Sequence, residues 1–320
     1  MQQDHGRSAD RPGEIPARGW RDALTRVKVE STNDQVSLLG AGVAFFFLLS
    51  LVPTLIAAIS VYGLVSNPAQ VQRQIEDVAE GLPSSARDLL VEQVSAVTDR
   101  STAGLSVGAI VAIALALWSA SAGVRHLIEA LNAAYGEEES RGPVRLYAQA
   151  LVLATGGIVG GALIVGVISI VPALLDETSM SAAANTALSL LRWPLLAVVF
   201  AVALGVLYRV GPDRDTPRTR WVSWGAVSAT GLWLLASAAF SIYAERFASF
   251  DTYGSLAGVI VLMLWLQLTA VVILLGAELN CELERQTTRD STVGRPEALG
   301  RRDAHAADTV GPSAEQVTAG

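Results

Sequence analysis

Long stretches without a single charged residue are the feature that most constrains how this chain can fold. The first runs from Gln35 to Gln72, and five more follow it along the 320-residue chain. Charged residues make up only 17% of the sequence, whereas soluble domains carry about 25%. Apolar runs of about 18 residues or more are typical of transmembrane helices. The composition therefore excludes a disordered, collagenous or disulfide-stabilised protein and predicts an integral membrane protein.

The charge-free windows predict an all-α fold, a polytopic membrane bundle of six transmembrane helices. A helix rises about 1.5 Å per residue, so about 20 residues cross the hydrocarbon core. The first and third windows are longer than this and can tilt or extend beyond the membrane. The fourth gives the weakest signal, because Arg192 lies within it. The predicted spans fall within residues 36–65, 102–124, 147–174, 186–208, 221–243 and 253–277.

Basic residues occur in alternate connections, and this pattern predicts the orientation. Arginine and lysine collect in the cytoplasmic loops of membrane proteins. The connection 175–185 contains no basic residue, and 244–252 contains only Arg246. All basic-rich connections fall on one side of a six-span bundle, so we predict that both termini are cytoplasmic. The basic residues of that side include Arg7, Arg11, Arg18, Arg21, Arg26, Lys28, Arg141, Arg145, Arg214, Arg218, Arg220, Arg285 and Arg289.

Three regions follow from these windows. Residues 1–35 form a polar cytoplasmic segment, and residues 36–284 form the six-span membrane domain. Residues 285–320 are rich in Ala, Gly, Asp and Thr, and we expect a disordered cytoplasmic tail. The connection 66–101 is the one sizeable outer segment, and its apolar spacing predicts two short amphipathic helices.

The N-terminal segment contains a candidate amphipathic helix. Trp20, Leu24 and Val27 recur at helical spacing, with Arg18, Arg21 and Arg26 around them. Such a helix is expected to lie on the inner leaflet of the membrane. A frayed tail with one short helix is the alternative.

Polar side chains within the predicted spans are the main functional candidates, because they are costly in lipid and usually face the bundle interior. In the first span, Pro53 removes a backbone hydrogen bond, and the hydroxyl of Ser50 can satisfy the freed group. At the end of the second span, Arg125, Glu129 and Asn132 lie on one helical face. They mark either a polar vestibule or a solvated juxtamembrane pair.

The sixth span repeats this pattern with Gln267 and Glu278, which lie within about 20° of each other around the helix. Tyr253 falls about 40° away on the same side. Gln267 is near mid-membrane, and Glu278 is near the cytoplasmic end, where Arg125 or another inner arginine can pair with it. We call the full set the polar-path candidates, with structural hydrogen bonds and ion pairs as the alternative explanation: Ser50, Pro53, Arg125, Glu129, Asn132, Gln267 and Glu278.

Other motifs point to packing and not to catalysis. Gly156/Gly160 and Gly157/Gly161 form overlapping GxxxG patterns, which support tight helix packing or a homo-oligomer without choosing between them. The sequence has no HExxH, CxxC, GxSxG or P-loop motif. Three histidines and one cysteine are too few for a metal site, and no basic, aromatic-interleaved surface indicates nucleic acid. We therefore predict a protein without enzymatic activity, metal or cofactor.

Three motifs follow one another along the membrane domain, and a fourth segment departs from the same pattern. The three motifs are Leu39–Pro53; Trp118–Ser121 with Ala130–Tyr135 and Arg141; and Tyr253–Gly258 with Trp265 and Gly276–Asn280. They resemble those of the YihY/BrkB family of bacterial inner-membrane proteins over about residues 18–285. The departure is at Tyr208–Pro212, where that family usually has a Tyr…Pro-Asn-like turn, whereas Asp213 stands here in place of the amide.

The resemblance implies six spans with both ends inside and a plasma (inner) membrane location. The family's older label, ribonuclease BN, is regarded as a misassignment, and the lack of metal ligands here argues against ribonuclease activity too. The resemblance also implies membrane lipids as partners and the export of envelope lipids or other amphiphiles as a role. Two hypotheses stay open: transport or translocation of an amphipathic envelope component or solute, and a non-transporting scaffold for envelope assembly. The sequence names no transported substrate.

Overall fold

The computed structural model describes the backbone of residues 5–65, 107–176, 182–247 and 255–319. Within these residues the regular structure is helical, apart from one isolated bridge between Pro217 and Thr292. Side chains are described for them except at 52–65, 107–113, 115–116, 162–176, 182–193, 245–247, 255–257 and 319. The predicted outer helices of 66–101 and Tyr253 therefore lie outside the described residues, as does the side chain of Pro53.

Long helices account for most of the described chain, and each predicted window overlaps one of them. Several continue past the window into charged sequence, because a helix needs favourable backbone conformation and not an apolar face at every turn. The long helices are α2 (Val36–Val65), α5 (Val107–Tyr135), α6 (Pro143–Asp176), α7 (Ala182–Val210), α8 (Thr219–Phe247) and α9 (Ser255–Glu284). The shorter ones are η1 (Pro12–Glu14), α1 (Ala17–Asn33), α10 (His305–Asp308) and α11 (Ala314–Ala319).

Three described helical stretches are long and apolar enough to cross a membrane: Pro143–Gly161, Thr219–Ala244 and Gly258–Glu284. The pair α1 and α2, bent by 61°, makes a fourth if it is counted as one span. Large apolar side chains point outward from these helices, with Val144 84% and Leu235 72% exposed. Such surfaces suit contact with lipid and not with water. The count of six spans stays a prediction.

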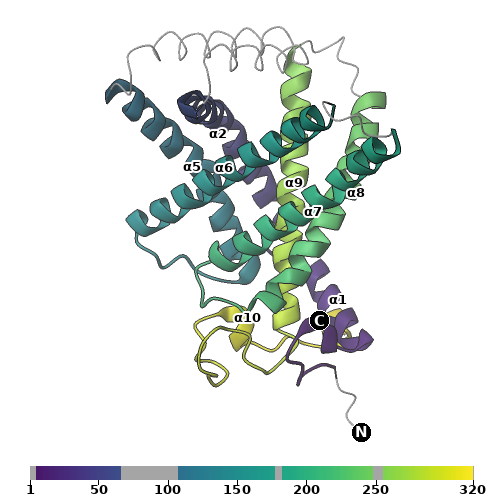
Figure 1. Ribbon diagram of the computed structural model, residues 1–320. Helices are drawn as coiled ribbons and strands as arrows, with labels where there is room; N and C mark the ends of the chain where they lie inside the picture. The colour runs from purple at the N-terminus through teal and green to yellow at the C-terminus, as the bar shows by residue number, and fades with distance from the viewer. Residues whose placement is uncertain (1–4, 66–106, 177–181, 248–254, 320) are drawn as a thin grey trace.

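The centre of the bundle is formed by α2 and α9, which pack against each other (Figure 1). Helix α5 packs on α2, and α8 packs on α9, while α6 and α7 run diagonally across the view. Fully buried Leu131, Tyr208 and Leu274 belong to the main apolar core, which joins α5, α7 and α9.

Two glycines let α8 and α9 approach closely. A Cβ on Gly225 would collide with the carbonyl oxygen of Gly276, and a Cβ on Gly276 would collide with the hydroxyl of Tyr208. The Gly225 amide donates to Oδ1 of Asn280 at 2.8 Å across this contact. By contrast, the GxxxG glycines of α6, Gly156 to Gly161, face open space within the described residues. Close packing inside the chain is therefore found at other glycines than those the motif indicated.

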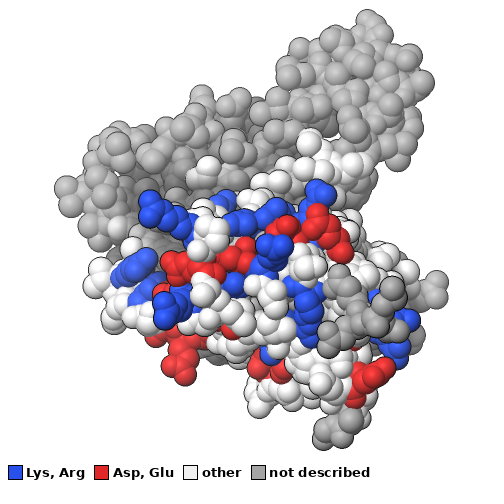
Figure 2. Space-filling model, turned by 90° about the horizontal axis from the view of Figure 1, so that it is seen from below, with Lys and Arg blue, Asp and Glu red and all other residues white. Residues whose placement is uncertain are grey.

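A polar layer, here called the base, closes the end of the bundle where both chain termini lie (Figure 1). It consists of residues 5–35, 136–142, 211–218 and 285–319. The underside of the molecule in Figure 2 shows acidic and basic side chains side by side across this layer. The base thus gathers the basic connections that the sequence analysis placed on one side.

The tail after α9 differs from the expectation of disorder, because it is folded into the base. Gln286, Ser291 and Arg302 are buried. The backbone of Thr288 donates to the Arg7 carbonyl at 2.9 Å, and the Gln286 amide side chain donates to the His5 carbonyl at 2.7 Å. The polar composition that suggested disorder instead supplies hydrogen bonds to distant parts of the chain.

Candidate functional site

The first polar-path candidate, Ser50, joins α2 to α5. Its hydroxyl is buried and donates to the carbonyl of Phe46 at 2.7 Å, one turn earlier, and approaches the Ser119 carbonyl of α5 at 3.3 Å. Gly123 of α5 lies directly opposite, where a Cβ would be 3.2 Å from the serine oxygen. Ser50 therefore acts in helix packing at a point of close approach.

Arg125 lies at the contact between α5 and α6 and is only partly covered. Its guanidinium carbon is 4.7 Å from the centre of the Tyr147 ring, and Nη1 donates to the Tyr147 hydroxyl. Its Nε is 3.9 Å from the carboxylate of Glu129 but makes no hydrogen bond. The ring of Trp118 also stacks on that of Tyr147, with the two ring centres 4.8 Å apart and the rings nearly parallel.

His126 completes this group. Its Nδ1 is 2.8 Å from the second oxygen of Glu129, and its ring stacks on Phe46 of α2 at 3.5 Å. We call the group the Arg125 cluster; its members are Trp118, Arg125, His126, Glu129 and Tyr147. A cation, a carboxylate and stacked aromatic rings thus meet at a partly exposed position beside apolar helix surfaces.

Asn132 lies deeper, at the junction with the base. Its Nδ2 donates to Glu139 at 2.8 Å, and its Oδ1 accepts from the backbone amide of Asp213 at 2.8 Å. Asp213 in turn accepts two hydrogen bonds from Ser140. Although burial raises it, the pKa of Asp213 is lowered by these bonds and by the charge of Arg141. Asn132 therefore ties two connections together, and Asp213, the departure from the family motif, is part of that tie.

The two candidates of α9 contact residues outside the Arg125 cluster. Glu278 is buried, with its Oε1 lacking a hydrogen bond, and it lies beside Asp34 at the end of α1. Burial raises the pKa of Asp34. Gln267 is half-buried where its backbone faces Gly40 of α2. Among the described residues Glu278 is not paired with Arg125, so that expected pairing is replaced by a contact between two acidic side chains.

The structure places the described candidates at several helix contacts, and whether they line one path stays a prediction. Ser50 belongs to the α2–α5 contact, Arg125 and Glu129 to the α5–α6 contact, and Asn132 to the base. Within the part of the chain that the structure describes, no group of three or more His, Cys, Asp or Glu side chains could hold a metal ion.

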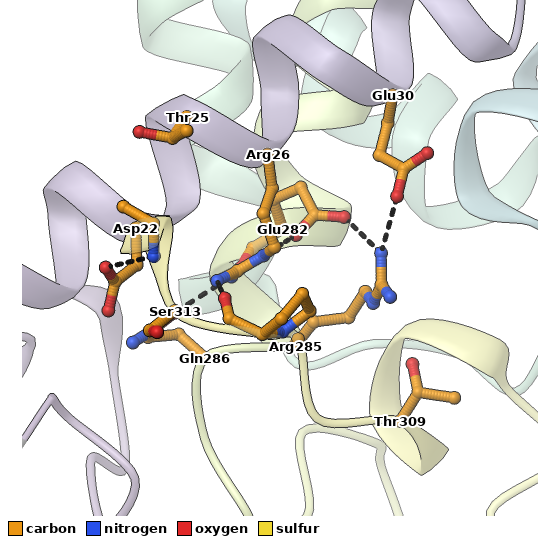
Figure 3. Close-up of polar contacts among 12 residues, drawn as sticks. Asp22, Thr25, Arg26, Glu30, Glu282, Arg285, Gln286, Thr309 and Ser313 are labelled. Carbon is orange, nitrogen blue, oxygen red and sulfur yellow. Dashed lines mark hydrogen bonds and ion pairs between the residues drawn. The ribbon is translucent and has the colours of Figure 1, made fainter. Parts of the chain in front are cut away.

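Sequence reasoning missed the buried ion pairs of the base. Arg26 of α1 pairs with Glu282 of α9, and both side chains are 1% exposed (Figure 3). The same guanidinium donates to the carbonyl of Glu282 at 2.9 Å, to Gln286 at 2.8 Å and to the Pro312 carbonyl at 2.8 Å. The sequence signal that could have predicted this pair is the helical spacing of small and polar residues on α1. The residues of this buried face are Gly19, Asp22, Ala23 and Arg26.

A second buried pair joins the connection after α7 to the end of α9. Arg214 and Glu284 are fully buried and 2.7 Å apart, and Ser291 donates to the same carboxylate at 2.7 Å. Burial alone would lower the pKa of Arg214, but the pairing with Glu284 raises it above its usual value. These pairs fix the end of α9 to the base.

Glu137 marks where the tail meets the connection after α5. It accepts a hydrogen bond from the His305 amide at 2.8 Å, and the His305 ring packs against Gly136. Burial raises the pKa of Glu137 to about 7. The pKa of His305 is lowered, again chiefly by burial. This contact therefore holds one carboxyl group, that of Glu137, which changes charge near neutral pH.

Comparison with known proteins confirms the resemblance found in the sequence. The sequence profile of the family described as "Virulence factor BrkB" matches residues 27–299. YfkH of Bacillus subtilis, which carries a ribonuclease-like name, is 33% identical over 251 residues, covering 77% of this chain and 89% of its own.

Other relatives carry names that refer to membranes. A UPF0761 membrane protein of Vibrio parahaemolyticus is 28% identical over 264 residues, covering 80% of each chain. One from Haemophilus influenzae is 23% identical over 256 residues, covering 79% of this chain and 91% of its own. No solved structure gives a significant match.

Proposed function

The chain belongs to the virulence factor BrkB family, and we propose that this membrane protein moves an amphipathic envelope component or solute across the bacterial plasma (inner) membrane. The observation that carries the proposal is the Arg125 cluster. It combines a cation, a carboxylate and exposed aromatic surface at the side of the bundle, where a molecule with a polar head and an apolar body can be held.

Arg125 follows the predicted window 102–124, at a helix end where its side chain can reach the membrane interface. Its side chain is 23% exposed, and the neighbouring Trp118 is 58% exposed. A guanidinium matches the geometry of a phosphate group, and tryptophan favours the membrane interface. We infer that Arg125 receives the polar head of the substrate while Trp118 contacts its apolar part.

A scaffold for envelope assembly is the second candidate, and the base favours it. Asn132, Ser50 and the buried ion pairs are satisfied by neighbouring groups, as in a packed structural element. The contacts of Glu278 with Asp34 and of the Gln267 backbone with Gly40 also favour this candidate. The two functions differ in whether the protein moves lipid when no partner protein is present.

Reconstitution of the full chain in liposomes separates them. Liposomes would carry fluorescent phospholipids of several headgroups, and the fraction reaching the outer leaflet would be measured with an impermeant quencher. We expect movement with the wild type, and slowing by about tenfold or more with Arg125→Gln, as for loss of a hydrogen bond to a charged group. Gln267→Ala tests whether α9 contributes to the same path.

Arg145→Gln is the matched control, because this arginine is exposed at the start of α6 and lies outside the cluster. It should leave the rate unchanged. A wild-type protein that moves none of the lipids would support the scaffold and contradict transport. Equal rates for wild type and Arg125→Gln would show that the path lies elsewhere.

A further inference from the structure

Helix α1 has two faces of opposite character. Its inner face, which includes Asp22 and Arg26, is buried in the base. Its outer face carries Arg21, Leu24 and Lys28, all exposed. The periodicity of the sequence suggested an amphipathic helix, but it placed Arg26 on the outside, where the structure has it buried.

The outer face is hollowed. An open hollow of about 700 Å³ lies over it, here called the α1 hollow. Leu24 is 53% exposed at its centre, and the basic residues flank this apolar floor. The residues lining it are Ala17, Trp20, Arg21, Leu24, Thr25 and Lys28.

The α1 hollow lies at the level where α8 begins its apolar stretch. The ring of Trp20 meets that of Trp224 edge-on at 5.2 Å. Trp224 is in the second turn of α8 and remains 43% exposed, and the apolar stretch runs from Thr219 to Ala244. Tryptophan is enriched at the boundary between headgroups and hydrocarbon. The hollow therefore faces the interface of the leaflet on the side of the base.

The charges of α1 are sorted between its two faces. Asp22 accepts hydrogen bonds inside the base from the Ala314 amide, at 2.8 Å, and from His5. Glu30 is turned toward Arg285. Among the described residues, the side chains of Arg21 and Lys28 are in no ion pair. The hollow therefore presents uncompensated positive charge beside apolar surface.

We propose that the α1 hollow binds one anionic phospholipid from this leaflet. The phosphodiester lies between Arg21 and Lys28, and the start of the acyl chains lies on Leu24 and Trp20. A lipid fits better than a soluble anion, because half of the lining is apolar and the Trp20–Trp224 pair marks the interface. Each cation near the surface contributes about fivefold in affinity, so loss of both lowers it roughly 30-fold. This binding is independent of the transport proposed above.

A fluorescent reporter next to the hollow tests the proposal on the full-length protein in liposomes. Val29→Cys carries a bimane label at a position that lies beside the hollow and leaves every lining residue in place; the native Cys281 is buried. Quenching is measured with a small fraction of brominated phosphatidylglycerol, or of brominated phosphatidylcholine, in a phosphatidylcholine bilayer. We expect phosphatidylglycerol to quench at a much lower fraction, and salt to weaken the difference.

The double variant Arg21→Gln/Lys28→Gln should shift half-quenching by phosphatidylglycerol to a roughly 30-fold higher fraction. Arg295→Gln/Arg301→Gln is the control, because both of these arginines are exposed in the tail and distant in sequence from the hollow. It should leave the quenching unchanged. Because all four side chains are exposed, the variants should elute like the wild type in size-exclusion chromatography.

Two results would overturn the proposal. Equal quenching by the two brominated lipids in the wild type would show that the hollow does not select an anionic headgroup. Reversal of the quenching by added inorganic phosphate, but not by sodium chloride of the same ionic strength, would show that it is a site for a soluble anion.

Discussion

In the base, arginines and carboxylates are buried inside the protein, whereas along α6, α7 and α8 valines and leucines are on the outside. Arg26 and Glu282 are hardly exposed, while Val144 and Leu235 are among the most exposed side chains. Each region thus reverses the rule for a water-soluble protein, but for different reasons. In the base, charges find partners within the chain; on the helices, apolar groups find lipid.

The difference shows which part of the molecule is held together by contacts within the chain and which part depends on its surroundings. A buried ion pair is stable only when both charges and their remaining hydrogen bonds are satisfied. The base meets this condition through residues distant in sequence, so contacts within the chain hold it together. The described parts of the long helices pack closely at glycines and present apolar side chains to the surrounding lipid. Each prediction below tests one side of this comparison.

The largest effect is expected from labelling of introduced cysteines, which tests whether the base faces the cytoplasm. Thr216→Cys, at an exposed position of the base, should react with an impermeant thiol reagent only after permeabilisation. Ala86→Cys, in the predicted outer segment, should react in intact cells. Labelling is all-or-none, and the reverse pattern would overturn the orientation with both termini inside.

The next effect is expected from breaking the buried pair of the base. Arg26→Ala leaves the buried Glu282 with Arg285 as its remaining ion-pair partner, and breaking a buried pair costs about 3–5 kcal/mol. The variant should unfold at a markedly lower temperature in detergent. Arg11→Ala is the control, because its pair with Glu14 is exposed, and exposed pairs contribute about 0–1 kcal/mol. Equal melting of the two variants would contradict a base stabilised from within.

The smallest effect is expected from Glu137, where the tail meets the connection after α5. Its pKa is about 7 in the folded protein and 4.5 in the unfolded chain. The folded state therefore binds the proton more tightly, and this contact weakens as pH rises from about 4.5 to about 7. Glu137→Gln should keep the His305 amide bond and remove this loss. The lowered pKa of His305 has the opposite effect, because protonation of His305 destabilises the contact at acidic pH. Glu137→Gln therefore retains only this loss of stability at acidic pH.

Hydrogen exchange of the amides around His305, corrected for intrinsic rates, measures this difference. Protection in Glu137→Gln should exceed that of the wild type at pH 8 and equal it near pH 4, below the unfolded pKa. Glu297→Gln, which changes an exposed carboxylate of the tail, should follow the wild type. Identical profiles for all three proteins would show that Glu137 does not hold the tail.

The long helices could be predicted from the sequence because their signal is local. A membrane span can be recognised from the apolar composition of its own residues. The window 36–65 therefore coincides with α2, and 221–243 lies within α8. The family could also be predicted, since three motifs stand in order in one chain. The number of spans and the orientation depend on segments and surroundings that local composition indicates only indirectly.

The base could not be predicted in the same way, because its contacts are not local. Arg26 and Glu282 are 256 residues apart, and each occurs in sequence that reads as solvated. The tail has the polar composition of a disordered segment, but its polar groups bind Arg7, His5 and Asp22. The Arg125 cluster was partly predicted: the pairing of Arg125 with Glu129 follows from helical spacing, whereas Tyr147 belongs to another helix.

The distance between Arg26 and Glu282 along the chain has a consequence for synthesis on the ribosome. Arg26 emerges among the first residues, but the carboxylate that completes its site is made 256 residues later. At about 5–20 residues per second, this interval is on the order of 10–50 s. During that time α1 has its buried face uncovered, and chaperones and proteases can reach it. A chain stopped before Glu282 therefore keeps a charged, unfinished surface, which marks it for removal.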